Sequence, residues 1–178
     1  SKSDVVLLLE ADTLPSDNSV FKQLIQAYKK RQKKDVMIVG SPNPSQQDSF
    51  YEKIQCSGYS AKIKFFSAWK NGKNLYTCTG HAGRLFSGAF VRTFRWPLDV
   101  PEDAYLYFFL KQNKLSFRTA RHAIINLRCV STIKDRGTQL TKFRSGESRL
   151  SDFFPSGLLN KEYRLTLKTC MELIIYGV

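Results

Sequence analysis

The sequence predicts an α/β fold in which a mostly parallel sheet is flanked by helices. Five consecutive aliphatic residues at 5–9 indicate a strand that is covered on both faces, as strands of parallel sheets are. Apolar residues at 20–28 recur at helical spacing, and a second aliphatic run within 35–40 indicates another buried strand. Strand, helix and strand in this order form a βαβ unit, which is the basis of the fold-class prediction.

The other elements are predicted from local signals along the chain. Ser16 or Asp17 can cap the first helix. Residues 41–48 are rich in Pro, Asn, Ser and Gln and are expected to form a loop, and 50–70 has a helical pattern interrupted at Gly58. The remaining expected elements are a turn at 71–74, strands at 75–78, 115–119 and 123–127, a glycine-rich stretch at 79–90, a connector at 97–101, a helix from Glu102, and a last helix capped by Ser131.

The charge balance points to an anionic partner. The chain has 28 Lys and Arg against 15 Asp and Glu, a net charge of +13. Nucleic acid, an anionic membrane face or phosphorylated substrates are the partner classes that such an excess favours. The one dense basic cluster, at 29–34, has a second interpretation, because cations at the end of a helix also complement its dipole.

Several function classes are excluded by what the sequence lacks. No C-x-x-C pair is present, so neither a disulfide scaffold nor a zinc ribbon is expected, and a reducing compartment fits best. His81 and His122 have no ligand-spaced partners, which argues against a histidine metal site or a Ser-His-Asp triad. Neither a signal-peptide pattern nor an apolar run of membrane-spanning length occurs.

Two carboxylates follow the first predicted strand. Glu10 and Asp12 flank Ala11, so in an extended strand they point the same way and could share one divalent cation. The carboxyl end of a strand is also where open α/β sheets bind their ligands. The alternative is that Asp12 caps the following turn while Glu10 is a solvated strand end.

Two later patterns contain candidate catalytic or binding residues. Glu102 and Asp103 begin a helix, where acids complement the dipole, but a carboxylate there could also act as a general base. Gln139, Lys142 and Phe143 share one helical face by their i, i+3, i+4 spacing and could bind phosphate and stack on a ring. The alternative for this second group is a surface helix with Phe143 in the core.

In their order along the chain, these patterns resemble the family 2 inverting glycosyltransferases. The resemblance covers residues 4–146 and is nearest to the membrane-associated branch that includes cellulose, chitin and hyaluronan synthases. It implies a GT-A (Rossmann-like) fold, of which this chain holds a part. It also implies transfer of a sugar from a nucleotide-diphosphate donor to an acceptor hydroxyl, with inversion and assisted by a metal.

The resemblance implies a role for each acidic residue. Asp12 corresponds to the second acid of the D-x-D motif, which reaches the metal, and Glu10 stands where the first acid is normally Asp. Asp103 corresponds to the catalytic base, and Glu102 to its neighbour in the motif.

Further substrate-binding residues follow from the same resemblance. Gly83 and Arg84 fall in the segment that lines the donor-sugar pocket. Gln139, Lys142 and Phe143 resemble the Q-x-x-R-W motif, with Lys in place of Arg and Phe in place of Trp. Lys lacks the bidentate fork of Arg, and Phe keeps a stacking face without the indole donor.

The implied cofactor is a divalent cation, Mg²⁺ or Mn²⁺, and the implied partners are a nucleotide-diphosphate sugar and a sugar, polysaccharide or lipid-linked acceptor. Residues 1–150 would be the C-terminal part of the catalytic domain, and 151–178 a helical extension near the membrane. We expect a soluble chain at the cytoplasmic face of a membrane, as part of a larger protein. Because the family's N-terminal nucleotide-binding elements have no counterpart here, we expect the isolated chain to transfer sugar weakly.

Two other functions remain as alternatives. A catalytically inactive domain of the same fold could serve as an assembly partner, in keeping with Glu10, Lys142 and Phe143. A basic nucleic-acid-binding module could use the cluster at 29–34 together with aromatic residues. The sequence argues against nucleic acid, because its aromatics cluster in apolar helices and no RRM, KH or helix-turn-helix signature is present.

Overall fold

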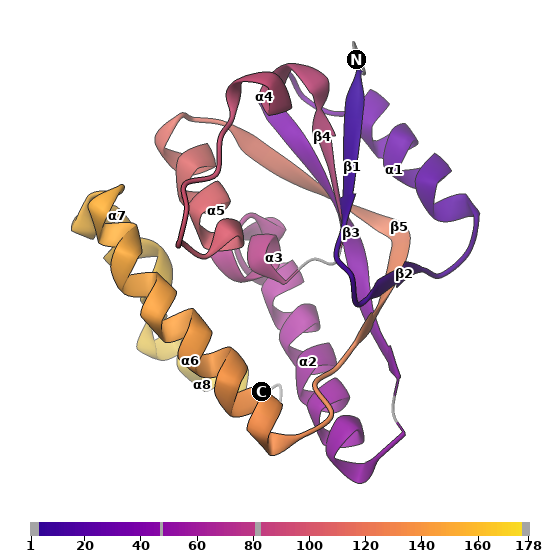
Figure 1. Cartoon of the computed structure of the whole chain (residues 1–178), viewed down its shortest axis with the longest axis vertical. Helices are drawn as coiled ribbons and strands as arrows, with labels where there is room; N and C mark the ends of the chain where they lie inside the picture. Colours follow the sequence, from indigo (N-terminus) through magenta and orange to yellow (C-terminus); the bar gives the residue numbers. More distant parts are fainter. Residues whose placement is uncertain (1–3, 47, 81–82, 176–178) are drawn as a thin grey trace.

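The computed structural model describes residues 4–46, 48–80 and 83–175, which form one sheet with helices on both faces (Figure 1). The strands are β1 (Val5–Leu9), β2 (Thr13–Pro15), β3 (Asp35–Gln46), β4 (Gly83–Ser87) and β5 (Ser116–Arg128). The helices are α1 (Ser19–Lys29), α2 (Phe50–Ala68), α3 (Leu75–Thr79), α4 (Gly88–Thr93), α5 (Glu102–Gln112), α6 (Ile133–Arg149), α7 (Ser156–Tyr163) and α8 (Leu167–Ile175), with short 3₁₀ turns at Trp69–Gly72 and Leu150–Asp152.

The α/β class is confirmed, but the sheet is mostly antiparallel. Its strand order is β1-β4-β3-β5-β2, and only the β3–β5 pair is parallel. The β1–β4, β3–β4 and β2–β5 pairs are antiparallel. The expectation of a mostly parallel sheet is therefore wrong.

The strand responsible for this difference is β4, in the middle of the glycine-rich stretch. It inserts antiparallel between β1 and β3, so those two strands run parallel to each other without being neighbours. Gly83 allows the insertion, because a Cβ at this position would collide with the side chain of Ile125. At the other edge, the chain turns after β1 and returns as β2, which pairs antiparallel with β5.

Two shorter predictions are also wrong. Residues 41–46 are not a loop but the second half of β3; there they pair with β5, whereas β4 pairs with β3 only at 37–39. That arrangement tolerates Pro42 and Pro44, which cannot donate to a neighbouring strand. The expected strand at 75–78 is helix α3, because buried Asn74 caps it by accepting from Thr77 N at 2.9 Å.

Helix α2 and strand β5 are each continuous where the sequence suggested a break. Ser49 and Glu52 form a reciprocal capping box that begins α2, and the helix continues through Gly58, whose Cβ position faces open space. The two strands expected at 115–119 and 123–127 are one strand with an irregularity in the pairing register after Ala120.

The two faces of the sheet bury separate apolar clusters. Met37, Val39 and Phe86 pack with α3, α4 and α5 on one face. Ile38 and Leu85, which alternate with them, pack on the opposite face against α1 through Val20, Leu24 and their neighbours. The end of β1, strand β4 and the start of α5 come together on the first face, through contacts of Arg84 with Glu10 and Asp103.

Helices α6, α7 and α8 lie outside α5, farther from the sheet (Figure 1). None of the helices in the described ranges combines the length and the apolar character needed to cross a bilayer.

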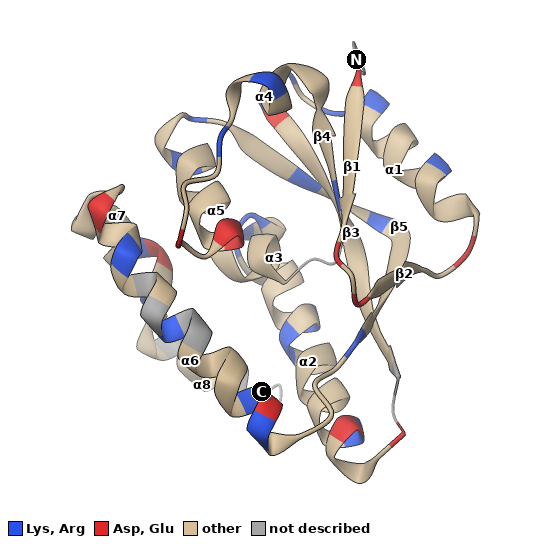
Figure 2. Cartoon of the chain, in the orientation of Figure 1, with Lys and Arg blue, Asp and Glu red and all other residues tan. Residues whose placement is uncertain are grey.

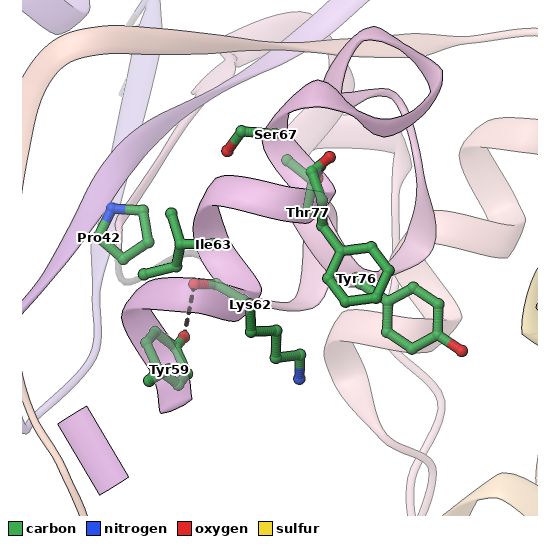
Figure 3. Close-up of a pocket in the computed structure, with 9 residues that line it drawn as sticks. Pro42, Tyr59, Lys62, Ile63, Ser67, Tyr76 and Thr77 are labelled. Atoms are coloured by element: carbon green, nitrogen blue, oxygen red, sulfur yellow. Dashed lines mark hydrogen bonds between the residues drawn. The ribbon is translucent and has the colours of Figure 1, made fainter. Parts of the chain in front are cut away.

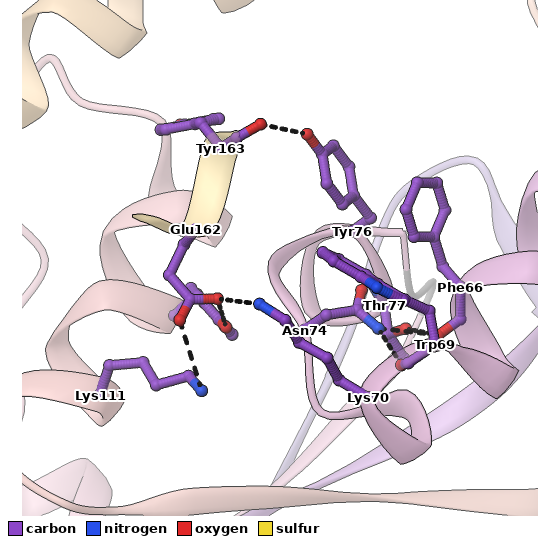
Figure 4. Close-up of polar contacts among 10 residues, drawn as sticks. Phe66, Trp69, Lys70, Asn74, Tyr76, Thr77, Lys111, Glu162 and Tyr163 are labelled. Atoms are coloured by element: carbon purple, nitrogen blue, oxygen red, sulfur yellow. Dashed lines mark hydrogen bonds and ion pairs between the residues drawn. The ribbon is translucent and has the colours of Figure 1, made fainter. Parts of the chain in front are cut away.

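A buried carboxylate connects α7 to the rest of the protein (Figure 4). The Glu162 side chain is 6% exposed and accepts a hydrogen bond from the Tyr107 hydroxyl at 2.6 Å. Lys70 lies 3.3 Å from one of its oxygens and Lys111 lies 3.8 Å from the other. Burial raises the pKa of Glu162, but Tyr107 and the two lysines outweigh it, so the net pKa lies below the ordinary value of 4.5.

Replacing Glu162 with Gln is expected to lower the free energy of unfolding by about 1–2 kcal/mol at pH 7. The effect is modest because Lys70 and Lys111 are each more than a third exposed and remain hydrated without the carboxylate. Since the folded-state pKa is lowered, the stabilisation by Glu162 is present above pH 4.5 and is lost as the pH falls through the folded-state value. Urea unfolding of both proteins from pH 7 down to pH 3 measures the difference.

The matched control is Asp152→Asn, which also turns a carboxylate into an amide but at an exposed position. It is expected to change stability by less than about 0.5 kcal/mol. A loss of stability in Glu162→Gln that is independent of pH would show that the charge of Glu162 is not what holds α7.

Candidate active site

Arg84 joins two carboxylates that are far apart in the sequence. Its Nη1 lies 3.2 Å from Oε1 of Glu10, and its Nη2 lies 2.7 Å from Oδ1 of Asp103. The Arg84 side chain is 5% exposed, whereas those of Glu10 and Asp103 are 43% and 33% exposed. The guanidinium is therefore covered by protein while both carboxylates reach the surface.

The sheet and α5 bring these three residues together. Arg84 lies in β4 with Leu8 of β1 and Val39 of β3 as its strand partners, and Glu10 follows β1 directly. Asp103 lies in the first turn of α5, where the helix dipole favours acids. Three residues from the predicted site thus form one cluster, which was expected only through the family resemblance.

The Glu10–Asp12 segment is a turn rather than an extended strand end. The Thr13 backbone N–H and hydroxyl both donate to the Glu10 carbonyl, at 3.2 and 2.8 Å. The chain then enters β2, and Asp12 is exposed. The extended conformation that was assumed when predicting a shared cation is therefore wrong. The charge of Asp12 nevertheless lies close enough to raise the pKa of Glu10.

Both Arg84-bound carboxylates have a raised pKa. For Asp103 the largest cause is burial, which Arg84 partly offsets and the neighbouring Glu102 charge reinforces. For Glu10 burial is again the largest cause, Arg84 lowers the pKa, and the charges of Asp103 and Asp12 raise it. A carboxylate whose pKa is shifted toward neutrality in this way is suited to take up a proton in a reaction.

Glu10 and Asp12 are the residues that could contribute carboxylates to a divalent cation whose other ligands come from a substrate. Glu10 and Asp103 contact one guanidinium and the charge of Asp12 acts on Glu10, so the ionised cluster is negative. It lies in a chain of net charge +13 whose Lys and Arg are spread over most of its elements (Figure 2). Within the described ranges, no group of three or more His, Cys, Asp or Glu side chains could enclose a metal. Mg²⁺ commonly takes only one or two protein carboxylates and completes its shell with phosphate oxygens and water.

Tyr59 of α2 belongs to the same neighbourhood and was not predicted from the sequence. Its hydroxyl donates to the Gly80 carbonyl at 2.8 Å. Burial raises its pKa most, and the charges of Glu10, Asp103 and Asp12 raise it further. Nothing in the helical pattern around Tyr59 indicates that its side chain would lie near the Arg84 cluster.

Helix α6 approaches the segment before α5 near its end, and a charge near its start acts on α2. Near its start, Arg136 is close enough to lower the pKa of Lys62 in α2. Near its end, Gly146 lies so close to Pro101 that a Cβ there would overlap the proline ring, only two residues before Asp103. Thr132, rather than the expected Ser131, caps this helix by accepting from Asp135 N at 3.0 Å.

The structure describes the predicted binding residues to different extents. Gln139 is half-buried and accepts a hydrogen bond from Arg136 Nη1 at 2.6 Å. Lys142 and Phe143 belong to the same helix, but their side chains lie outside what the structure describes. Gly83 is buried inside β4, and Glu102 is exposed beside Asp103.

No protein-family model matches this sequence, and no curated protein matches it either. The functional assignment therefore rests on the residues and their arrangement.

Proposed function

We propose that the chain is part of an inverting glycosyltransferase that uses a nucleotide-diphosphate sugar. The single observation that carries this proposal is the contact of Arg84 with both Glu10 and Asp103. An acid at a strand end and an acid at a helix start are each weak signals alone. Their convergence on one guanidinium supports the two roles, phosphate-side acid and catalytic base, that the motif order implies.

Asp103 is the proposed general base. Arg84 holds its Oδ1, so Oδ2 is the oxygen that would take the proton of the attacking acceptor hydroxyl. Burial keeps the pKa of Asp103 above the ordinary 3.8, which strengthens it as a base, while Arg84 fixes its position. Attack on the anomeric carbon opposite the leaving diphosphate inverts that centre without a covalent intermediate.

Asp12 and Glu10 are the proposed acids on the diphosphate side. Asp12 is exposed, and Glu10 is shared with Arg84. A divalent cation, when bound, would offset the charge that develops on the departing diphosphate. We assign Asp12 the larger part in holding it, because the carboxylate of Glu10 already has a cationic partner.

The proposal is tested by sugar transfer from a panel of nucleotide-diphosphate sugars, using the protein expressed from its own gene. We expect release of nucleoside diphosphate to require Mg²⁺ or Mn²⁺ and to stop with EDTA. Asp12→Asn is expected to lower the rate roughly 10–100-fold at a fixed metal concentration, and excess metal should restore part of it.

Asp17→Asn is the matched control, an exposed aspartate five positions further along whose loss should leave transfer unchanged. Transfer that is insensitive to EDTA and to Asp12→Asn would contradict the proposed metal-assisted reaction. Absence of transfer with every donor would favour the inactive-domain alternative.

A further inference from the structure

Two buried cysteines meet where α2 lies against the end of β5, and the proposed reaction uses neither of them. Cys56 is 1% exposed and Cys129 is 8% exposed. Their Sγ atoms lie 2.9 Å apart, although 73 residues separate them in the sequence. All four cysteines of the chain are thiols in the structure.

The contact brings the two sulfur atoms close to bonding distance. A disulfide joins its sulfurs at about 2.05 Å, so closing this bond requires a movement of less than about 1 Å. Small rotations of the two side chains can supply such a movement while the backbone stays in place. The Cys56–Cys129 pair is therefore arranged for a disulfide that the structure does not contain.

The elements that carry the two thiols hold them in position. Cys56 lies one turn after Glu52, whose capping box fixes the start of α2. One turn further along, the Tyr59 hydroxyl donates to the Gly80 carbonyl at 2.8 Å, which fixes α2 at a second point (Figure 3). Cys129 directly follows β5, which pairs with strands on both sides. Because both thiols are placed in advance, their reaction with each other is favoured over reaction with a thiol of another molecule.

We propose that Cys56 and Cys129 form a redox site that hydrogen peroxide converts to a disulfide. The more accessible Cys129 sulfur attacks a peroxide oxygen, the O–O bond breaks, and the sulfur becomes a sulfenic acid as one water leaves. The Cys56 sulfur then attacks the sulfenic sulfur, which forms the S–S bond and releases a second water. In total, two thiols lose two electrons and two protons, and one peroxide is reduced to two water molecules.

Burial sets both the rate and the oxidant of this reaction. It is the largest of the causes that raise the pKa of Cys129 to about 12, and the contact with Cys56 comes next. Because the thiolate is the nucleophile, oxidation is expected to be slow at pH 7 and to accelerate about tenfold for each pH unit between pH 7 and pH 9. A bulky oxidant such as oxidised glutathione is expected to react far more slowly than hydrogen peroxide, since the protein covers both sulfurs.

The test treats the native chain with hydrogen peroxide at pH 8, blocks the remaining thiols, and maps the peptides by mass spectrometry. We expect a linked pair of peptides that contain Cys56 and Cys129, lighter by two hydrogen atoms than the reduced pair and separated again by dithiothreitol. Because the bond closes a long loop, it is expected to raise Tm by about 5–10 °C.

Cys78 is the matched control within the same protein. It is buried in α3, and burial raises its pKa to about 12 as well, so it differs from Cys129 in lacking a printed sulfur contact rather than in its thiol chemistry. It should remain a thiol under the same treatment. In Cys56→Ser, the sulfenic acid of Cys129 should be trapped by dimedone in place of the disulfide, whereas Cys170→Ser should leave disulfide formation unchanged.

Absence of the linked peptides from the oxidised wild type would overturn the site, and this measurement needs no variant to fold. The same holds for linkage of Cys56 or Cys129 to Cys170 in equal yield, for an equal yield of the Cys56–Cys129 pair in urea-unfolded protein, and for an oxidation rate that does not change with pH. No sugar donor enters the assay, so its outcome does not depend on the proposed function.

Discussion

Asp103→Asn is expected to slow sugar transfer roughly 10²–10⁴-fold, the usual contribution of a general base. The amide can still accept a hydrogen bond from Arg84 Nη2 in place of Oδ1, so the local structure should persist. Only the ability to take the acceptor proton is lost. The loss is therefore expected in kcat, with little change in the KM for the donor.

The pH dependence gives a second readout for this variant. Since burial raises the pKa of Asp103 above 3.8, the wild-type rate should rise with pH through that raised value as the carboxylate ionises. This acidic limb should be missing from the residual activity of Asp103→Asn. Asp99→Asn, a change at an exposed aspartate just before the same helix, is the control and should leave both rate and profile intact. Near wild-type transfer by Asp103→Asn would remove Asp103 as the base.

Elements with a strong hydrophobic or charge pattern could be predicted from the sequence, because the residues within each element determine its conformation. The aliphatic run of β1, the one-sided pattern of α1 and the acidic start of α5 are examples. Strand β4 could not be predicted in the same way. All five of its residues are buried, one is Gly83 and the next is Arg84, a combination that has no strand pattern of its own.

The burial of Arg84 in a strand is compensated by Glu10 and Asp103, which reach it from other elements. No local sequence pattern indicates that these partners are present. Because the strand directions in the sheet depend on β4, the prediction of a mostly parallel sheet was wrong for the same reason. For the candidate site, Glu10, Arg84 and Asp103 could be named in advance from motif order. Tyr59 could not, since it lies in an ordinary helical pattern.

Arg84→Met is expected to lower the free energy of unfolding by about 2–4 kcal/mol at pH 7. Methionine fills most of the buried volume, so the loss is mainly electrostatic: Glu10 and Asp103 would remain close together without the cation between them. The exposure of both carboxylates, 43% and 33%, keeps the effect below that of a fully buried pair, because water can hydrate them.

The size of this loss should depend on pH in a definite direction. Both carboxylates already have a folded-state pKa above the ordinary 4.5 and 3.8, so as the pH falls the folded protein takes up these protons before the unfolded chain does. Their protonation therefore favours the folded state, and this gain is lost as the pH rises through the raised values. Removing Arg84 raises both pKa values further, so the difference between Arg84→Met and wild type should be largest at pH 7 and shrink toward pH 4.

Urea unfolding of wild type, Arg84→Met and Arg84→Lys at pH 7, 5 and 4 measures this effect. Lysine keeps the charge but cannot contact two carboxylates through a fork, so an intermediate loss is expected. Arg92→Met, at an exposed position in α4, is the control for net charge and should change stability by less than about 0.5 kcal/mol. A loss in Arg84→Met that is equal at all three pH values would mean that the two carboxylates do not depend on the charge of Arg84. In that case the cluster would also lose its value as support for the proposed active site, because Arg84 is what links Glu10 to Asp103.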